Sequence, residues 1–253
     1  MNASDTPITS FAFDLVIPDE VKQEISRIPN GKSHGLHSCP TKILKSSANV
    51  ISSTLAQIIN LSISTGVYPK KLKMAKIIPI FKADDNTDAN NGRLISLLPN
   101  FNRIFEKLIF NGMESFIEKN KLFSLSQYGF RKSHSTHHAI LDIVNTIQTN
   151  MPLDKRLFSY GVFIDLKKAF DTVDHKILLD KLYHYGFRGI INKWFSSYLE
   201  DRTQTTQIGS FISPEKNITF GVPQGSVLGP LLYINDIQEC SEKLQFLCFR
   251  AIQ

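Results

Sequence analysis

The chain has 253 residues, 42% of them hydrophobic and 21% charged, which is typical of a folded soluble chain and excludes a disordered tail or a collagen-like repeat. Its 29 basic and 23 acidic residues give a net charge of +6, so a polyanionic partner is permitted but not required. No apolar run approaches the ~20 residues that span a bilayer, and the three cysteines lack metal-ligand spacing, as expected of free thiols.

The first half of the chain predicts helices around one short strand. The spacing of apolar residues predicts helices over 51–66, over 105–117 and from Ser135 onward. Residues 73–82 favour a strand, and Pro79 places it at a sheet edge because proline donates no backbone hydrogen bond. The polar run 84–92 predicts a loop.

The second half mixes strands and helices without regular alternation. Residues 158–166 are apolar and favour a strand that ends in a carboxylate. Helical spacing and turn residues predict two helices and three further strands, at 174–186, 191–198, 203–208, 217–222 and 244–249. This irregular mixture favours an α+β fold over a doubly wound parallel sheet.

Asp165 stands at the end of the apolar run 158–166. A carboxylate that is withdrawn from water needs a cation or strong hydrogen bonds. It could simply cap the strand end beside a solvated charged turn. Alternatively, it could bind Mg²⁺, which takes hard oxygens, usually from one or two carboxylates and from substrate phosphates.

Residues 221–230 (GVPQGSVLGP) contain three glycines and two prolines, which specify a tight turn with little side-chain cover. Gln224 offers both a hydrogen-bond donor and an acceptor at the centre of this segment. The segment could be a purely structural turn between a strand and a helix. Its ten-residue order nevertheless makes it a strong candidate for a functional loop.

Basic residues near loops form a third candidate group. Arg131, Lys82 and Arg93 lie in or beside predicted loops, where a guanidinium or ammonium group can bind phosphate. For any single one of them, ordinary surface charge is the better interpretation.

These segments together resemble the reverse transcriptase of non-LTR (LINE-like) retrotransposons. The resemblance covers roughly residues 31–247, most of the chain, and its segments follow the order of that family. The matching segments are Tyr68–Lys82, Arg93–Leu98 (RLISLL), Phe105–Lys107, Gln127–Arg131 (QYGFR) with Ser135 and Thr136, Val162–His175 (VFIDLKKAFDTVDH), Trp194–Gln204, Gly221–Leu232 (GVPQGSVLGPLL) and Tyr233–Asp236.

The resemblance implies a role for each of the candidate residues. Asp165 would be the first catalytic carboxylate and would hold Mg²⁺ together with the backbone carbonyl of Leu166. Phe170 would be the steric gate that selects deoxynucleotides, and Gln224, followed by Gly225, would contact the nucleotide and the template. Arg131, Lys82 and Arg93 would face phosphates, and Gly225 would also belong to the nucleotide- and phosphate-binding residues. The reaction would be the attack of a primer 3′-oxygen on the α-phosphate of a dNTP.

The resemblance also implies a right-hand polymerase of the α+β class. We expect a helical N-terminal extension over 1–60, fingers over 61–150 and a partial palm over 151–253, with the thumb absent. The expected partners are an RNA template, a DNA primer and dNTP, with Mg²⁺ as cofactor. No membrane partner is expected, and the oligomeric state and the cellular location stay open.

One expected motif of the family is missing from the sequence. A second carboxylate pair should follow in a strand and turn of the form aromatic-Ala-Asp-Asp. Instead, the predicted strand 244–249 is followed by Arg250-Ala251-Ile252-Gln253, and no acidic residue follows Glu242. We therefore interpret the chain as a C-terminally truncated copy and expect that it does not polymerise as written.

Three functional hypotheses follow from this combination. The chain could be a metal-dependent RNA-directed DNA polymerase, a nucleic-acid-binding remnant without chemistry, or a relic of a retroelement with no function. An Asp-Asp pair in the genomic reading frame after codon 249 would favour the first hypothesis over the other two.

Overall fold

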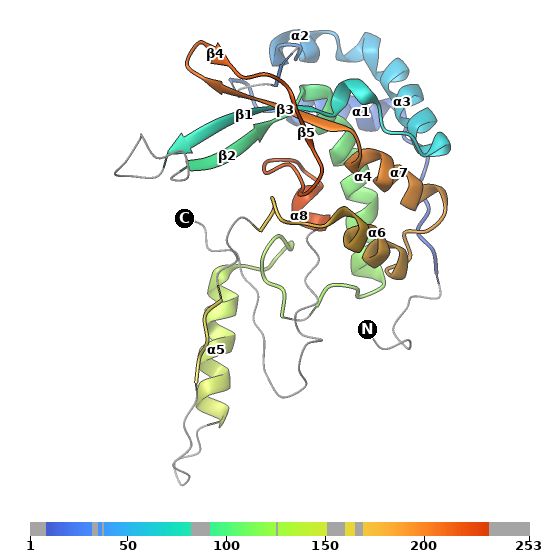
Figure 1. Cartoon of the computed structure of the whole chain (residues 1–253). Coiled ribbons are helices and arrows are strands. Elements are labelled where there is room, and N and C mark those ends of the chain that lie inside the picture. Colours follow the sequence, from blue (N-terminus) through green and yellow to red (C-terminus); the bar gives the residue numbers. More distant parts are fainter. Residues whose placement is uncertain are drawn as a thin grey trace. The chain divides into compact units, whose positions relative to one another are not determined.

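The computed structural model of the chain describes residues 9–31, 35–36, 38–81, 92–124, 126–150, 160–164 and 169–232. The chain forms two compact units. The larger unit comprises Asn2–Phe116 and Lys168–Leu232, and the smaller unit comprises Ile117–Lys167 and Tyr233–Gln253 together with Met1. Figure 1 shows their helices and strands in sequence colours.

The larger unit combines helices with a mixed sheet, which confirms the predicted α+β class. Its helices are α1 (Pro18–Arg27), α2 (Thr41–Ser46), α3 (Ala48–Thr65), the 3-10 helix η1 (Lys70–Leu72), α4 (Asn100–Lys119, whose last turn enters the smaller unit), α6 (His175–His184), α7 (Ile190–Leu199) and α8 (Gly229–Leu232). Its strands are β1 (Met74–Phe81), β2 (Gly92–Leu97), β3 (Arg202–Ile208), β4 (Phe211–Ile212) and β5 (Lys216–Ile218). The smaller unit contains α5 (Thr136–Asn150).

Helix α3 confirms the helix predicted over 51–66. Gly66 ends it with a φ of 67°, and its N–H bonds back to the carbonyls of Ser62 and Ile63. The N-terminal segment is fastened to this helix by Asn60, whose side chain accepts from the Val16 N–H and donates to the Val16 carbonyl, each at 2.9 Å. One amide side chain therefore satisfies both backbone groups of an otherwise irregular residue.

The described strands form one sheet in the order β2-β1-β3-β4, with β5 also paired to β3 (Figure 1). Strand β1 is antiparallel to β2 and parallel to β3. The predicted strand over 73–82 is therefore confirmed, but its predicted position at a sheet edge is wrong. The parallel ladder to β3 ends at Ile77, two residues before Pro79, so the missing N–H of Pro79 does not interrupt it.

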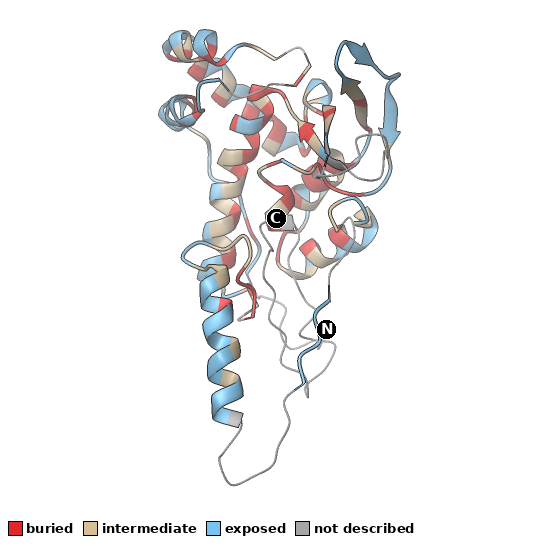
Figure 2. Ribbon diagram, turned by 90° about the vertical axis from the view of Figure 1, so that its left-hand side faces the viewer, coloured by how far each residue is buried: buried red, intermediate tan, exposed pale blue. Residues whose placement is uncertain are grey.

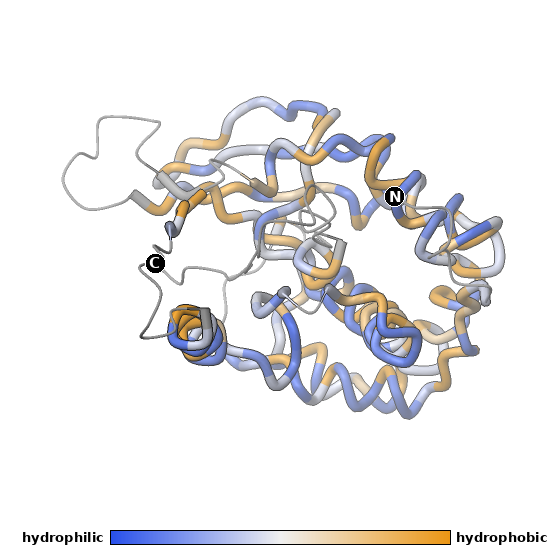
Figure 3. The backbone as a smooth tube through the Cα atoms, turned by 90° about the horizontal axis from the view of Figure 1, so that it is seen from below, coloured by the Kyte–Doolittle hydropathy of each residue, from blue (hydrophilic) through white to orange (hydrophobic). Residues whose placement is uncertain are grey.

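The core of the larger unit is built around α7. Trp194, Phe195 and Tyr198 are all fully buried, as their helical spacing predicts. Figure 2 shows how buried and exposed positions are distributed over the helices and strands. The rings of Trp194 and Tyr198 are stacked, with centroids 5.8 Å apart and planes inclined by 9°. The indole N–H of Trp194 donates to the Ser62 hydroxyl at 3.0 Å, which satisfies its only polar group. Hydrophobic and hydrophilic positions are interleaved along the helices (Figure 3), as expected of helices that bury one face.

Helix α6 begins and ends as the sequence predicts. Asp174 caps its N-terminus by accepting hydrogen bonds from the N–H groups of Lys176 (2.8 Å) and Ile177 (3.0 Å). After the helix, Gly186 has a φ of 97°. The N–H of Phe187 then bonds back to the carbonyl of Leu182 at 2.9 Å.

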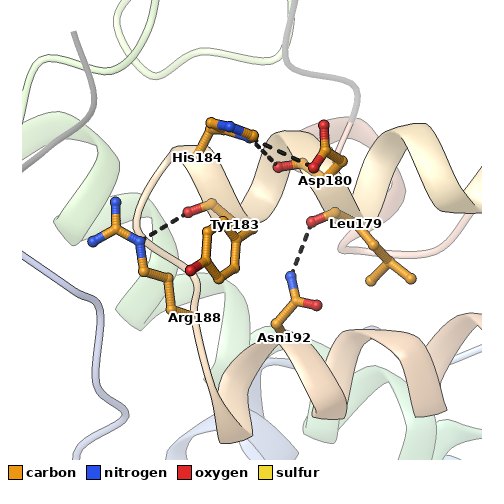
Figure 4. Close-up of polar contacts among 6 residues, drawn as sticks. All are labelled: Leu179, Asp180, Tyr183, His184, Arg188 and Asn192. Atoms are coloured by element: carbon orange, nitrogen blue, oxygen red, sulfur yellow. Dashed lines mark hydrogen bonds and ion pairs between the residues drawn. The ribbon is translucent and has the colours of Figure 1, made fainter. Parts of the chain in front are cut away.

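Polar side chains hold α6 and α7 together as a helical hairpin (Figure 4). Asn192 on α7 donates to the carbonyl of Leu179 on α6 at 2.9 Å. In the connection between the helices, Arg188 donates from Nε to the Tyr183 carbonyl at 3.2 Å. Its guanidinium also lies over the Tyr183 ring, 5.5 Å from the centroid. These contacts fix the turn that leads into α7.

In the smaller unit, α5 confirms the helix predicted to begin near Ser135. The Ser135 hydroxyl accepts from the N–H of His138 at 3.4 Å, as a capping residue does. The helix is tied to the segment before it by a hydrogen bond from the Tyr128 hydroxyl to the Asp142 carboxylate.

The strand predicted over 158–166 is wrong for residues 160–164. No strand is assigned there, and the side chains of Tyr160, Val162 and Phe163 are 90%, 83% and 84% exposed. A β-favouring run becomes a strand only when a neighbour pairs with its backbone, and no described strand pairs with these five residues. The rest of that prediction, the predicted loop apart from Gly92, and the predicted strand 244–249 lie outside the described residues.

Within the described ranges, no helix has both the length and the apolar character that crossing a membrane requires. This finding concerns only those ranges.

Candidate functional site

The segment Gly221–Pro230, called here the 221–230 loop, begins by bonding to the turn that contains Phe170. The N–H of Gly221 donates to the Val173 carbonyl and the N–H of Val222 donates to the Phe170 carbonyl, both at 2.8 Å. The strand predicted over 217–222 is therefore correct only as β5, which ends at Ile218. Beyond it, backbone donors bond to the Phe170 turn instead of continuing the sheet.

Gly221 is required at this junction. It has a φ of 84°, and a Cβ built there would lie 2.8 Å from the carbonyl oxygen of Phe170. Its own carbonyl lies 2.7 Å from Nε2 of His175, the first residue of α6, so that imidazole nitrogen carries the proton of the hydrogen bond. The start of α6 thus holds the start of the loop.

The centre of the loop is bonded to strand β2. The N–H of Ser96 donates to the Gln224 carbonyl at 2.9 Å. Gly225 follows with a φ of 115°, and a Cβ there would lie 3.0 Å from the Ser96 carbonyl oxygen. The backbone of Gln224 is therefore fixed, while its side chain is half-buried. These contacts bring Phe170, Gln224 and Gly225 into one part of the larger unit.

The last part of the loop is bonded to a buried carboxylate on α4. Glu106 is fully buried, and its Oε2 accepts from the Val227 N–H at 2.6 Å. Its Oε1 accepts from the Tyr198 hydroxyl at 2.7 Å and from the Asn102 amide at 2.8 Å. Asn102 in turn accepts a hydrogen bond from the Tyr68 hydroxyl. The network therefore joins Tyr68, which lies just before η1, to α4, α7 and the 221–230 loop.

Burial keeps both phenols of this network neutral. Burial raises the pKa of Tyr68 and of Tyr198 well above the ordinary value of 10.0, and the nearby Glu106 carboxylate raises both further. Each phenol therefore keeps its proton and acts as a donor. Sequence reasoning missed the role of Glu106, although an acidic residue inside the apolar stripe of a helix is an available signal.

Arg202, the first residue of β3, lies fully buried beside the same network. Its Nη1 donates to the Tyr198 carbonyl at 3.0 Å, and its guanidinium carbon lies 4.8 Å from the Tyr198 ring centroid. In the described part of the chain, its Nε and Nη2 have no hydrogen-bond partner. The hydrogen bond to Tyr198 and the contact with its ring therefore offset part of the desolvation cost of the buried guanidinium.

Of the other predicted site residues, the structure describes Arg131 and the backbone of Arg93. Arg131 lies in the smaller unit, with its guanidinium 5.3 Å from the Phe123 ring centroid and its Nη1 donating to the Ser124 carbonyl at 3.4 Å. The backbone of Arg93 lies in β2 opposite Ile80. The Arg93 side chain, and the residues Lys82, Asp165 and Leu166, lie outside what the structure describes.

No group of three or more acidic, histidine or cysteine side chains among the described residues could hold a metal ion. The predicted metal ligands, Asp165 and Leu166, are not among them. The described site is therefore a backbone scaffold around Phe170 and Gln224, fastened to α6, β2 and α4.

Comparison with known proteins identifies the family of the chain. The model of the family described as "Reverse transcriptase (RNA-dependent DNA polymerase)" matches residues 80–249. The chain therefore belongs to the reverse transcriptase family.

Its relatives are polymerases of non-LTR retrotransposons, as the sequence predicts. The chain is 34% identical over 225 residues to the "RNA-directed DNA polymerase from mobile element jockey" of Drosophila melanogaster. That alignment covers 88% of this chain and 24% of the other protein. It is 31% identical over 238 residues to the "Probable RNA-directed DNA polymerase from transposon BS" of the same species. This second alignment covers 92% of this chain and 26% of the other protein. The chain thus spans about a quarter of the length of these curated relatives.

A solved structure, the "Partial Cas6-RT-Cas1--Cas2 complex", is also similar in part. The alignment covers 86% of this chain and 32% of that one, with 20% identity and a TM-score of 0.41.

Proposed function

We propose that the chain acts in RNA-directed DNA synthesis and binds an RNA template, a DNA primer and dNTP. In this proposal, residues 61–150 form fingers, residues 151–253 form part of a palm, and residues 1–60 form a helical extension. The observation that carries it is the 221–230 loop, whose backbone is bonded to the Phe170 turn and to β2 within a chain of the reverse transcriptase family.

The proposed roles are those that the family resemblance implies, and the contacts of the loop support them. Phe170 would pack where a ribose 2′-hydroxyl would otherwise sit, and its backbone is held by the Val222 N–H. The amide of Gln224 would contact the nucleotide and template while its carbonyl stays bonded to Ser96. Gly225 would lie beside the nucleotide, and its lack of a side chain lets the Ser96 carbonyl approach the loop. Arg131, Lys82 and Arg93 would bind phosphates.

Mg²⁺ is the proposed cofactor. The donor set available for it is the Asp165 carboxylate and the Leu166 backbone carbonyl, which are hard oxygens of the kind that Mg²⁺ prefers. Substrate phosphates usually complete such a shell. When bound, the ion would neutralise charge on the triphosphate. The residues of the chain would orient the nucleotide and the template for the attack.

A second candidate function is binding without chemistry. It is favoured by the sequence 243–253, which contains no carboxylate and places Arg250 where the family motif calls for an acidic pair. Two metal ions at a primer end would need more than the one carboxylate of Asp165. For the 253-residue polypeptide we therefore expect template–primer binding in the absence of primer extension.

Binding and extension on poly(rA)/oligo(dT) separate these possibilities. The wild-type chain should bind the hybrid, with log affinity falling linearly with log salt concentration because phosphate contacts dominate. Arg131→Ala should weaken binding and flatten the salt slope, while Lys22→Ala, on α1, should not. Extension that vanishes in Asp165→Ala would establish catalysis and reject the second candidate. Absence of salt-dependent binding would reject both.

A further inference from the structure

The Glu106 carboxylate joins three segments that are distant in sequence. Glu106 lies on α4, Tyr198 on α7 and Val227 in the 221–230 loop, and each of the two partners donates to the carboxylate. Glu106 itself is fully buried. A buried carboxylate is costly unless several donors face it, and an apolar residue of similar size would often fill such a site without loss of stability. Packing alone therefore does not explain a charge at this position.

The two carboxylate oxygens of Glu106 accept hydrogen bonds from different parts of the fold. Oε1 accepts from Tyr198 and from Asn102, both of which belong to the helical core. Oε2 accepts from the Val227 N–H at 2.6 Å, a short distance typical of a charge-assisted hydrogen bond. One oxygen therefore serves the core and the other serves the loop.

The loop contact lies three residues after Gln224. Gln224 itself is fixed on the other side by Ser96, which donates to its carbonyl at 2.9 Å. Between these two attachments stand Gly225, which has a φ of 115°, and Ser226, whose N–H donates to the Pro223 carbonyl at 3.0 Å. Releasing Val227 would free this tight turn at one end and allow the Gln224 backbone to move.

We propose that Glu106 is a positioning residue for Gln224: its buried carboxylate holds the Val227 N–H and thereby fixes the loop that presents Gln224 to the nucleotide and template. This inference rests on the proposed function, in which Gln224 makes that contact. Glu106 does not touch substrate in this proposal. It acts only through the loop.

Glu106→Gln is the sharpest variant because it keeps the size of the side chain. The amide has one acceptor oxygen and one donor group in place of two acceptors. If its oxygen serves Tyr198 and Asn102, its NH₂ group faces the Val227 N–H, and two donors oppose each other. Tyr198→Phe is the matched control, since it removes a donor from Oε1 and leaves the Oε2 contact with Val227 intact.

Two readouts test the positioning role. In ¹⁵N-valine NMR spectra of the full chain, the Val227 amide should exchange about tenfold faster in Glu106→Gln and remain protected in Tyr198→Phe. In titrations of dTTP into the chain bound to poly(rA)/oligo(dT), Glu106→Gln and Gln224→Ala should each raise the Kd for dTTP about tenfold. Adding Glu106→Gln to Gln224→Ala should have little further effect, because both act through the same contact.

The fold is monitored in each variant by Trp194, the single tryptophan, which is fully buried. If its emission shows that Glu106→Gln does not fold, Val227→Pro replaces it, because proline removes the N–H from the loop side. Val227→Ala, which keeps the N–H, is then the matched control. Val227→Pro should raise the Kd for dTTP and Val227→Ala should not.

The outcomes separate this inference from the proposed function. If the wild-type chain binds neither the hybrid nor dTTP, the proposed function fails and the inference fails with it. If the wild-type chain binds dTTP but Glu106→Gln changes only the exchange of Val227, the proposed function stands and the positioning role is overturned. Equal effects of Glu106→Gln and Tyr198→Phe on the Kd for dTTP would also overturn it, because they would indicate a general role in the core.

Discussion

At the scale of single residues, Gly221 shows why the 221–230 loop begins with a glycine. Gly221 combines a φ of 84° with a backbone contact to Phe170 that leaves no space for a Cβ. Gly209, in the turn between β3 and β4, also has a positive φ of 59° but has nothing within 4 Å of a built Cβ. The two positions therefore separate backbone strain from steric overlap.

We expect Gly221→Ala to lower the free energy of unfolding by more than Gly209→Ala. The strain of a positive φ costs roughly 1–2 kcal/mol at either position, and only Gly221→Ala adds displacement of the Phe170 carbonyl. Urea unfolding followed by Trp194 fluorescence measures both. Equal losses in the two variants would show that the Phe170 turn yields to the new methyl group and that the contact is not a constraint.

The resemblance names candidate site residues but not the contacts that hold them. Phe170, Gln224 and Gly225 are expected from the resemblance, and their roles stay predictions, whereas the structure shows which backbone groups they bond to. The partners that fix the 221–230 loop, Ser96 and Glu106, lie more than a hundred residues earlier in the chain. An acidic residue within the apolar stripe of a helix indicates that Glu106 is special, but residue spacing does not tell which distant group it bonds to.

At the scale of elements, local signals predicted the helices well. Helices α3, α4, α6 and α7 carry apolar residues at helical spacing, and α6 also carries its own N-cap in Asp174. The sheet was harder to predict because β1 pairs with β3, a strand more than a hundred residues later. That long-range pairing made Pro79 misleading. Residues 160–164 have no described strand partner and are exposed despite a β-favouring sequence.

The cap of α6 gives a prediction at this scale. Asp174 accepts from two N–H groups that the helix itself cannot satisfy, so Asp174→Ala should lower the free energy of unfolding by about 1 kcal/mol. Asp174→Asn keeps an acceptor oxygen at the same place and should retain most of the stability. Thermal or urea unfolding compares the three proteins. If the asparagine variant loses as much as the alanine variant, the carboxylate charge and not the hydrogen bonds is what stabilises the helix end.

At the scale of the whole molecule, the buried tyrosines couple the stability of the larger unit to alkaline pH. Both Tyr68 and Tyr198 have a pKa well above 10.0 in the folded protein, because burial and the Glu106 carboxylate disfavour the phenolate. In the unfolded chain each phenol titrates near its ordinary value of about 10. Below that pH both states hold the protons, so these groups impose no pH dependence there. Above it, the unfolded chain holds fewer protons, and the free energy of unfolding must fall as pH rises.

Each such tyrosine contributes a slope of about 1.4 kcal/mol per pH unit above pH 10 until its folded pKa is reached. We therefore expect a steep loss of stability in that range, and Tyr198→Phe should reduce the slope by the share of one tyrosine. The variant also loses the hydrogen bond to Glu106, which lowers stability at every pH, so the slope and not the absolute value carries the test. Lys73, whose pKa is lowered mainly by burial, titrates in both proteins, and its contribution cancels in the comparison. Urea unfolding at several pH values, followed by Trp194 fluorescence, gives both slopes. Parallel curves for wild type and Tyr198→Phe would mean that Tyr198 ionises in the folded protein as easily as in the unfolded chain, contrary to its burial against Glu106.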